Sequence, residues 1–182
     1  MKIVELRRHS LKAAPGNSDL SPAGVELAKH VGATELRGRA FTHLFVSPLK
    51  RTRDTLRTMR QGAGDFPVIE PKIFAPHTIA SSPEGMSLWE GACNRAEHAG
   101  LDMLTAALTE EPRIAKDIAQ KGAEAFRAWL NELPDGTHAL VVGHSPFFEL
   151  VAYDLFGVTL PQLQPCEGFK IIEKAGKLSL ET

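Results

Sequence analysis

Three short apolar runs in this chain have the composition of buried strands, and each one ends in polar, chemically reactive residues. "KIVEL" leads into Arg8 and His9, "THLFVS" ends at Ser47, and "ALVVG" leads into His144. Stretches with apolar residues at helical spacing lie between these runs, so the chain alternates strands with helices. That alternation predicts a three-layer α/β/α sandwich with a mostly parallel sheet.

Flanking residues predict where several elements begin and end. Ser21 is expected to cap a helix that has Pro22 at its first position, and Gly157 to end a helix over "PFFELVAYDLF". "PLKRTRDTLRTMRQ" predicts a helix directly after the second apolar run. "PVIEPKIF" is a candidate third strand, although two prolines weaken that assignment. The tail "GFKIIEKAGKLSLET" alternates and turns at Ala175 and Gly176, which predicts a hairpin at an antiparallel edge.

The length of 182 residues suits one domain with a hydrophobic core of its own. The chain has no internal repeat and no linker long enough to divide it. The region from Ser81 to about Leu133 is mostly helical in pattern. We therefore expect a single domain over residues 1–182, with a helical cap inserted at about residues 75–112.

Composition argues against several classes of protein. The formal net charge is −1, so no overall field draws the chain to nucleic acid or to an anionic membrane. No segment reaches the ~18 apolar residues of a membrane-spanning helix. The two cysteines, Cys93 and Cys166, lie far apart, which fits a reducing compartment. Because Glu5, Arg7 and Arg8 interrupt the stretch where a signal peptide is apolar, we expect a cytoplasmic protein.

Parallel strands bring their carboxyl ends to one edge of a sheet, where open α/β folds bind ligands. Arg8, His9 and His144 would meet there, together with Arg51 from the first turn of the helix after the second strand. Helical geometry turns Arg51 away from a stripe of solvated arginines formed by Arg53, Arg57 and Arg60. Guanidinium groups bind phosphate oxygens bidentately, and adjacent positive charge keeps an imidazole neutral and nucleophilic. These residues predict a phosphate pocket with a candidate nucleophilic histidine.

Four motifs extend this interpretation: "LRRHS", "LSPAG", "VSPLKRTRDT" and "VVGHSP". In this order they resemble L-x-R-H-G, L-[ST]-x-x-G, S-P-L-x-R-[AT]-x-x-T and the second histidine motif of the histidine phosphatase superfamily, the phosphoglycerate mutase-like family. The matched motifs lie within residues 3–146. The resemblance implies a phosphoglycerate mutase-like fold and a phosphoryl group transferred to His9 and then to water. It also implies that Arg8 and Arg51 clamp the phosphoryl oxygens, that His144 completes the cage, and that no metal or other cofactor takes part.

Other candidate site residues follow from the same resemblance. Ser10 stands where the family usually has glycine; it keeps the position small and adds a hydroxyl, so we expect activity to survive. Many relatives carry a glutamate that protonates the leaving group, and we favour Glu84, after a Ser-Pro turn, over Glu90 in a "WEG" triplet that this donor normally precedes. A solvated helix carboxylate is the alternative for either. Asn17 could reach the phosphate as a loop amide, with a plain turn residue as the alternative. Arg7, on the opposite face of its strand, is expected to be a structural or surface residue.

The leading prediction is a metal-independent phosphatase of the histidine acid type, acting on a phosphorylated small molecule or a phosphoprotein through a phosphohistidine on His9. A mutase would also have to bind a second acidic group of its substrate, and the sequence commits no further basic cluster to that role. The main alternative is a non-catalytic phosphate- or phosphoprotein-binding module, because Ser10 replaces the family glycine. A nucleic-acid site on the arginine stripe is disfavoured by the interleaved Asp54, the overall charge and the scarcity of tyrosine. The oligomeric state is left open.

Overall fold

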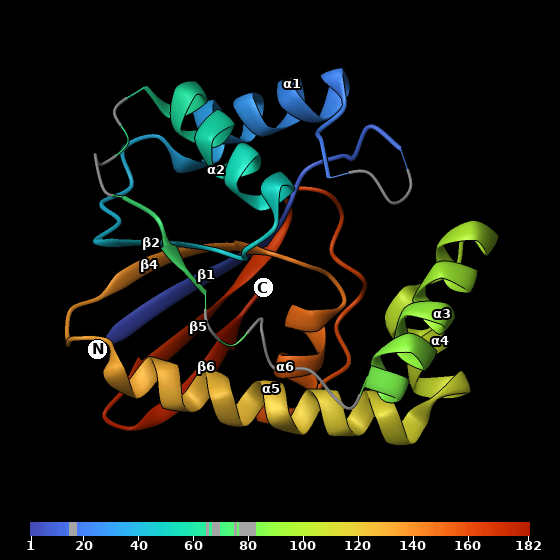
Figure 1. The fold of residues 1–182 in the computed structure, drawn as a ribbon. Coiled ribbons are helices and arrows are strands. Elements are labelled where there is room, and N and C mark those ends of the chain that lie inside the picture. The colour runs from blue at the N-terminus through green and yellow to red at the C-terminus, as the bar shows by residue number, and fades with distance from the viewer. Residues whose placement is uncertain (15–17, 65, 67–69, 75, 77–82) are drawn as a thin grey trace. The chain divides into compact units, whose positions relative to one another are not determined.

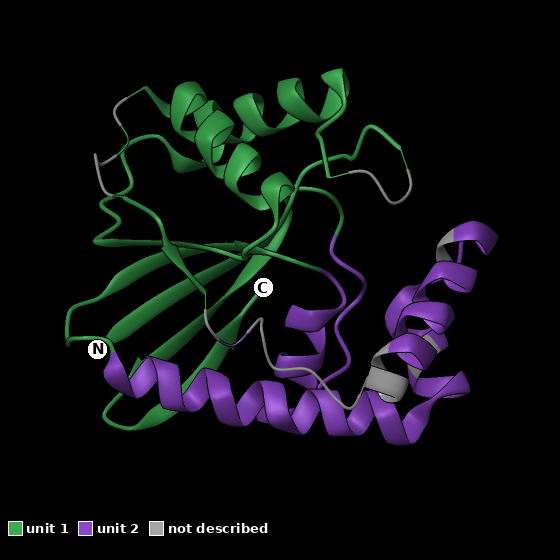
Figure 2. Ribbon diagram, in the orientation of Figure 1, with its two compact units in different colours: residues 1–74, 133–144, 164–182 green, residues 75–132, 145–163 purple. Residues whose placement is uncertain are grey.

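The computed structural model describes residues 1–14, 18–64, 66, 70–74, 76 and 83–182 (Figure 1). The chain divides into two compact units (Figure 2). The first contains residues 1–74, 133–144 and 164–182, and the second contains residues 75–132 and 145–163. Among the described residues, no helix is long and apolar enough to cross a membrane. The sheet belongs to the first unit, and the second unit is helical.

Six strands of the described chain form one sheet in the order β3-β2-β4-β1-β5-β6 (Figure 1). They are β1 (Lys2–Arg8), β2 (His43–Val46), β3 (Lys72–Ile73), β4 (His138–Gly143), β5 (Gly168–Lys174) and β6 (Lys177–Glu181). β1 pairs in parallel with β4, β4 with β2 and β2 with β3, whereas β5 pairs antiparallel with β1 and β6. The predicted α/β fold with a mostly parallel sheet and an antiparallel edge is confirmed.

The helices of the first unit are α1 (Pro22–Val31) and α2 (Lys50–Ala63), with a π-helical segment, η1 (Gly32–Leu36), after α1. Ser21 caps α1 as predicted, because its hydroxyl accepts the N–H of Gly24 at 3.0 Å. α1 and α2 lie side by side (Figure 1), and a Cβ at Gly32 would lie 2.0 Å from the carbonyl oxygen of Met59. Apolar residues from these helices and from the central strands share a buried core that includes Ala28, Val31, Leu44, Val46, Leu56, Met59, Leu140 and Val142.

The second unit contains α3 (Pro83–Ala99), α4 (Met103–Glu110), α5 (Pro112–Glu132) and α6 (Phe147–Phe156). The helical pattern expected up to about residue 133 is therefore confirmed where the chain is described. Gly157 ends α6 as predicted, with a left-handed φ of 68°. The four helices share a buried cluster made of Trp89, Leu104, Ala115, Ile118, Ala119 and Leu150.

The two remaining strand predictions have different outcomes. The terminal hairpin is confirmed: β5 and β6 are joined at Ala175 and Gly176, whose φ angles are 52° and 75°. The third strand is much shorter than "PVIEPKIF", because β3 covers only Lys72–Ile73. Pro71 has no N–H group with which to extend the pairing toward the amino end. Residues 67–69 of that stretch lie outside the described part of the chain.

Candidate active site

The carboxyl ends of β1, β4 and β2 are nearly level in the sheet. β1 and β4 pair up to their last residues, and β2 pairs with β4 up to Val142. Two hydrogen bonds continue the ladder beyond the strands: the N–H of His9 donates to the carbonyl oxygen of Gly143 at 2.9 Å, and the N–H of Ser47 donates to that of Val142 at 3.1 Å. This edge of the sheet therefore carries His9, Ser47 and His144 within the first unit.

His9 is buried at the end of β1, with 6% of its surface exposed. Its ring nitrogen Nδ1 lies 2.6 Å from the carbonyl oxygen of Ser10. A carbonyl oxygen can only accept a hydrogen bond, so Nδ1 must carry the proton. In the neutral ring the other nitrogen, Nε2, then holds the lone pair, which is the state that a nucleophilic histidine requires.

Its surroundings keep His9 neutral. Burial lowers the pKa of His9 to about 3, and the positive charges of Arg51, Arg8 and Lys12 act in the same direction, against the opposing hydrogen bond to Ser10. Burial penalises the imidazolium, and the three cations repel it. The ring is therefore neutral at neutral pH, with one proton on Nδ1 and a lone pair on Nε2.

His144 follows β4 and is also buried, with 7% of its surface exposed. Its ring and that of His9 lie edge to face, with centroids 5.1 Å apart. One guanidinium nitrogen of Arg51 lies 3.3 Å from Nδ1 of His144, and the hydroxyl of Ser47 lies 2.7 Å from Nε2. A guanidinium can only donate, so Nδ1 is the acceptor and Nε2 carries the proton that Ser47 accepts. The structure thus brings together the predicted residues His9, Arg51 and His144.

Buried hydroxyl groups support this arrangement, and sequence reasoning assigned them no role. The hydroxyl of Ser47 lies 3.0 Å from that of Thr52, and the Thr52 hydroxyl donates its proton to the carbonyl oxygen of Leu49 at 2.7 Å. One turn later, Thr55 accepts the N–H of Ser10 at 3.0 Å and donates to the carbonyl oxygen of Arg51 at 2.8 Å. The sequence did contain a signal for this role: Thr52 and Thr55 lie on the buried side of a polar helix, where their hydroxyl groups need hydrogen-bond partners inside the protein.

Three other predicted positions lie outside this group of contacts. Asn17 falls outside the described residues. Glu84 lies in the first turn of α3, and its side chain is not among those that the structure describes. Glu90 lies on α3 and is exposed. The roles assigned to Asn17 and Glu84 therefore stay predictions.

Arg7 is a buried structural residue. Its guanidinium pairs with Glu5 at 2.6 Å and with Glu35 at 2.8 Å, and donates to the carbonyl oxygen of Cys166 at 3.1 Å. Glu5 is also buried and binds Arg39 at 2.9 Å. The ion pair with Glu35 connects β1 to η1, and the hydrogen bond to Cys166 connects it to the segment before β5, away from the chemistry expected of Arg8 and His9.

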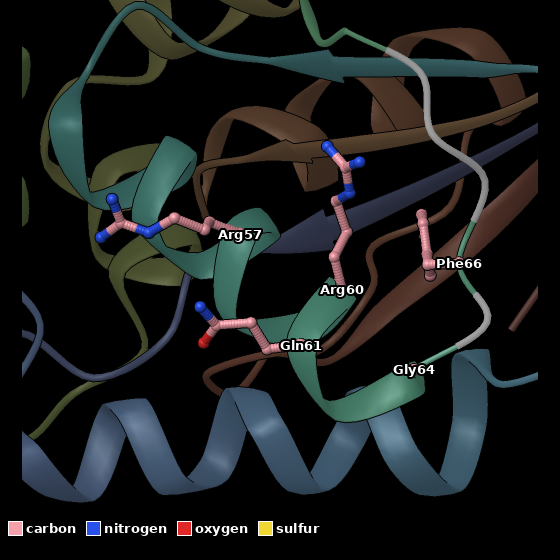
Figure 3. A pocket seen from close by; sticks show the side chains of 5 residues that line it. All are labelled: Arg57, Arg60, Gln61, Gly64 and Phe66. Carbon is pink, nitrogen blue, oxygen red and sulfur yellow. The ribbon is translucent and has the colours of Figure 1, made fainter.

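A hollow of about 360 Å³ lies at the carboxyl end of α2, at the opposite end of this helix from Arg51 (Figure 3). It is lined by residues of the last turns of this helix and of the segment after it: Arg57, Arg60, Gln61, Gly64 and Phe66. Asp54 pairs with Arg57 at 2.8 Å and offsets part of the positive charge. The carboxyl end of a helix also disfavours an anion. The amino end of α2, where Arg51 lies, suits a phosphate better than this hollow does.

The chain belongs to the histidine phosphatase superfamily (branch 1), whose family model matches residues 5–170. The family suggested by the four motifs is thereby confirmed. A comparison with curated proteins finds no match to this chain.

Solved structures share the fold over nearly the whole chain at low sequence identity. A phosphoglycerate mutase from Bacillus anthracis str. Sterne has a TM-score of 0.71 and 14% identity, covering 100% of this chain and 92% of that one. A phosphoserine phosphatase from Entamoeba histolytica, in complex with 3-phosphoglyceric acid, has a TM-score of 0.60 and 18% identity over 100% and 96% of the two chains. The protein histidine phosphatase SixA, complexed with tungstate, has a TM-score of 0.61 and 15% identity over 99% and 94%. These similarities establish the phosphoglycerate mutase-like fold.

Proposed function

We propose that this protein is a metal-independent phosphatase that hydrolyses phosphomonoesters or phosphohistidine through a phosphohistidine intermediate on His9. The observation that carries the proposal is the state of the His9 ring. Its Nδ1 donates to the carbonyl oxygen of Ser10, and its pKa is lowered to about 3, so Nε2 offers a lone pair at neutral pH. A buried, neutral imidazole among cationic side chains suits attack on an anionic phosphoryl group.

The reaction has two steps. Nε2 of His9 attacks phosphorus, so an N–P bond forms and the bond to the leaving group breaks, which is P–O in an ester and P–N in phosphohistidine. The leaving oxygen or nitrogen takes up a proton. Water then attacks the phosphohistidine, the N–P bond breaks, and inorganic phosphate leaves with neutral His9 restored. The proton lost by this water balances the proton gained by the leaving group.

Arg8, Arg51 and His144 are assigned to the phosphoryl oxygens. His144 contacts an oxygen with a proton on Nδ1, because a phosphoryl oxygen can only accept a hydrogen bond. The distance of 3.3 Å between the Arg51 guanidinium and Nδ1 of His144 is long for a hydrogen bond. Replacing this contact with one from Arg51 to a phosphoryl oxygen therefore costs little free energy. Ser47 holds His144 from the other side of the ring. The arginines supply the positive charge that a metal ion supplies in other phosphoryl-transfer enzymes.

Protonation of the leaving group is assigned to Glu84. A general acid matters most when the leaving group is a poor one, so Glu84→Gln should slow hydrolysis of an alkyl phosphate far more than that of p-nitrophenyl phosphate. Glu90→Gln is the matched control and should affect neither substrate. Equal effects of Glu84→Gln on both substrates would remove this assignment.

The remaining assignments concern the substrate. Asn17 is proposed to contact it, whereas Ser10, a candidate for the same role, is completely buried with its hydroxyl donated to Gly24. Residues 75–112 are proposed to form a cap that selects among phosphorylated small molecules and phosphoproteins. Protection of α3 and α4 from hydrogen exchange on addition of vanadate would support the cap, and unchanged exchange would count against it. We expect the protein to act in the cytoplasm, where the thiols of Cys93 and Cys166 stay reduced.

A phosphatase is favoured over a mutase because the sequence commits no further basic cluster to a second acidic group. The phosphoserine phosphatase and SixA are phosphatases by name, and the Bacillus anthracis protein is named a mutase. The alternative is a phosphate-binding module of the same fold, since Ser10 replaces the motif glycine.

The deciding experiment is hydrolysis of p-nitrophenyl phosphate in excess EDTA by the wild type, His9→Ala and His30→Ala. His30 is an exposed histidine of α1 and serves as the control. Turnover that persists with EDTA and in His30→Ala, but is lost in His9→Ala, is the expected result. Vanadate binding without turnover in the wild type would favour the binding module.

A further inference from the structure

Ser10 follows His9 in the chain and is completely buried. Each of its polar groups makes a hydrogen bond within the first unit. Its hydroxyl donates to the carbonyl oxygen of Gly24 at 2.7 Å, and its N–H donates to the hydroxyl of Thr55 at 3.0 Å. Its carbonyl oxygen accepts the Nδ1 proton of His9 at 2.6 Å. One residue therefore connects the His9 ring to both α1 and α2.

The contact with α1 depends on close packing that glycine permits at position 24. A Cβ atom there would lie 2.3 Å from the carbonyl oxygen of Leu11, so a side chain would push the first turn of α1 away. The N–H of Ser21, the cap of this helix, donates to the same oxygen of Leu11 at 3.0 Å. The carbonyl of Gly24 is thereby held within reach of the Ser10 hydroxyl.

The contact with α2 leads to an arginine of the site. Thr55 accepts the N–H of Ser10 and donates its own proton to the carbonyl oxygen of Arg51 at 2.8 Å. The backbone of Arg51 is thus linked to the His9 ring through Thr55 and Ser10. A displacement of Ser10 would move the imidazole relative to the helix that carries the guanidinium.

We propose that Ser10 is a positioning residue. Its hydroxyl bond to Gly24 and its N–H bond to Thr55 hold its carbonyl oxygen against Nδ1 of His9, and so fix the tautomer in which Nε2 is the nucleophile. The partner of one imidazole nitrogen determines which nitrogen is protonated, so the position of this oxygen sets the tautomer. The catalytic consequence rests on the proposed function, whereas the tautomer of His9 does not.

The test compares Ser10→Ala with Thr137→Val. Thr137 is buried in the same unit, and its hydroxyl donates to the carbonyl oxygen of Pro134 at 2.7 Å. Each substitution therefore removes one hydroxyl-to-carbonyl hydrogen bond from a buried position. The first measurement is the ¹⁵N chemical shift of each ring nitrogen of His9, which separates protonated from unprotonated nitrogen. The wild type and Thr137→Val should contain the Nδ1–H tautomer alone, and Ser10→Ala a mixture of both tautomers.

The second measurement is turnover of p-nitrophenyl phosphate. Ser10→Ala should lower kcat about tenfold with little change in KM, and Thr137→Val should keep kcat within about twofold of wild type. A single Nδ1–H tautomer and an unchanged kcat in Ser10→Ala would overturn the proposal. If the wild type shows no turnover, the proposed function fails, and the ¹⁵N shifts still decide the role of Ser10.

Thr55→Val provides an independent variant in case Ser10→Ala does not fold. It keeps the shape of the side chain, but removes the acceptor for the N–H of Ser10 and the donor to Arg51. The ¹⁵N shifts of His9 should again report a mixture of tautomers. A single Nδ1–H tautomer in folded Thr55→Val would contradict the role given to this link.

Discussion

The imidazole rings of His9 and His144 lie edge to face, with centroids 5.1 Å apart and 64° between the ring planes. Each ring has a different partner: the carbonyl oxygen of Ser10 binds Nδ1 of His9, and the hydroxyl of Ser47 binds Nε2 of His144. The acceptor nitrogen is therefore Nε2 in His9 and Nδ1 in His144. The two histidines are therefore held in opposite tautomers, so one can act as a nucleophile on Nε2 while the other faces Arg51 through Nδ1.

Replacing Arg51 with lysine should lower kcat/KM for p-nitrophenyl phosphate about 100-fold, equivalent to ~2.7 kcal/mol of transition-state stabilisation. Lysine keeps the charge, but it cannot bind two phosphoryl oxygens with a planar fork. Arg53→Lys, on the exposed side of the same helix, is the control and should retain wild-type kinetics. Wild-type kinetics in Arg51→Lys would mean that Arg51 contributes only its charge, and similar losses in both variants would mean that the effect is not specific to Arg51.

Ser47→Ala should lower kcat about tenfold, because it removes the acceptor that orients Nε2–H of His144. It should also reduce the free energy of unfolding by about 1–3 kcal/mol, since the buried nitrogen is left without its partner. Urea unfolding and steady-state kinetics measure the two effects separately. Loss of stability with a wild-type kcat would restrict Ser47 to a structural role.

Protonation of His9 should make the folded state less stable in acid. The pKa of His9 is about 3 in the folded protein, against an ordinary value of 6.5 in the unfolded chain, so the unfolded chain binds more protons between these values. The contribution of neutral His9 to the free energy of unfolding is present in full above pH 6.5. It decreases as the pH falls toward 3, with a slope approaching ~1.4 kcal/mol per pH unit. The measurement is urea unfolding at a series of pH values for the wild type and His9→Gln. The wild type should lose more stability than the variant as the pH falls, and identical pH profiles would contradict the lowered pKa.

Two glutamates that bind the same arginine should differ in their effect on stability. Glu5 and Arg7 form a buried ion pair, so Glu5→Gln should cost about 3–5 kcal/mol by removing the buried carboxylate that faces the Arg7 charge. Glu35 binds the same guanidinium with 49% of its side chain exposed, so Glu35→Gln should cost less than about 1 kcal/mol. Urea unfolding of both variants makes the comparison. Equal losses would mean that burial does not determine the strength of this network.

Local patterns were enough to predict much of the fold. Ser21 caps α1 and Gly157 ends α6 because capping and left-handed turns depend on residues that are neighbours in the chain. His9 and His144 could be named because polar residues that directly follow buried strands meet at one edge of a parallel sheet, and Arg51 because it lies in the first turn of the helix after such a strand. The length of β3 was predicted wrongly, since strand pairing at a sheet edge depends on which backbone groups find a partner.

The sequence by itself determined which chemical groups reach the edge of the sheet, because the order of strands and helices follows from hydrophobic periodicity. Only the tertiary structure decided their protonation. The proton of His144 is set by Ser47, which comes from another strand, and the pKa of His9 is set mainly by burial. Burial and long-range hydrogen bonds exist only once the helices have packed on the sheet. For that reason a serine after His9 could be recognised in the sequence, but its bonds to Gly24 and Thr55 could not.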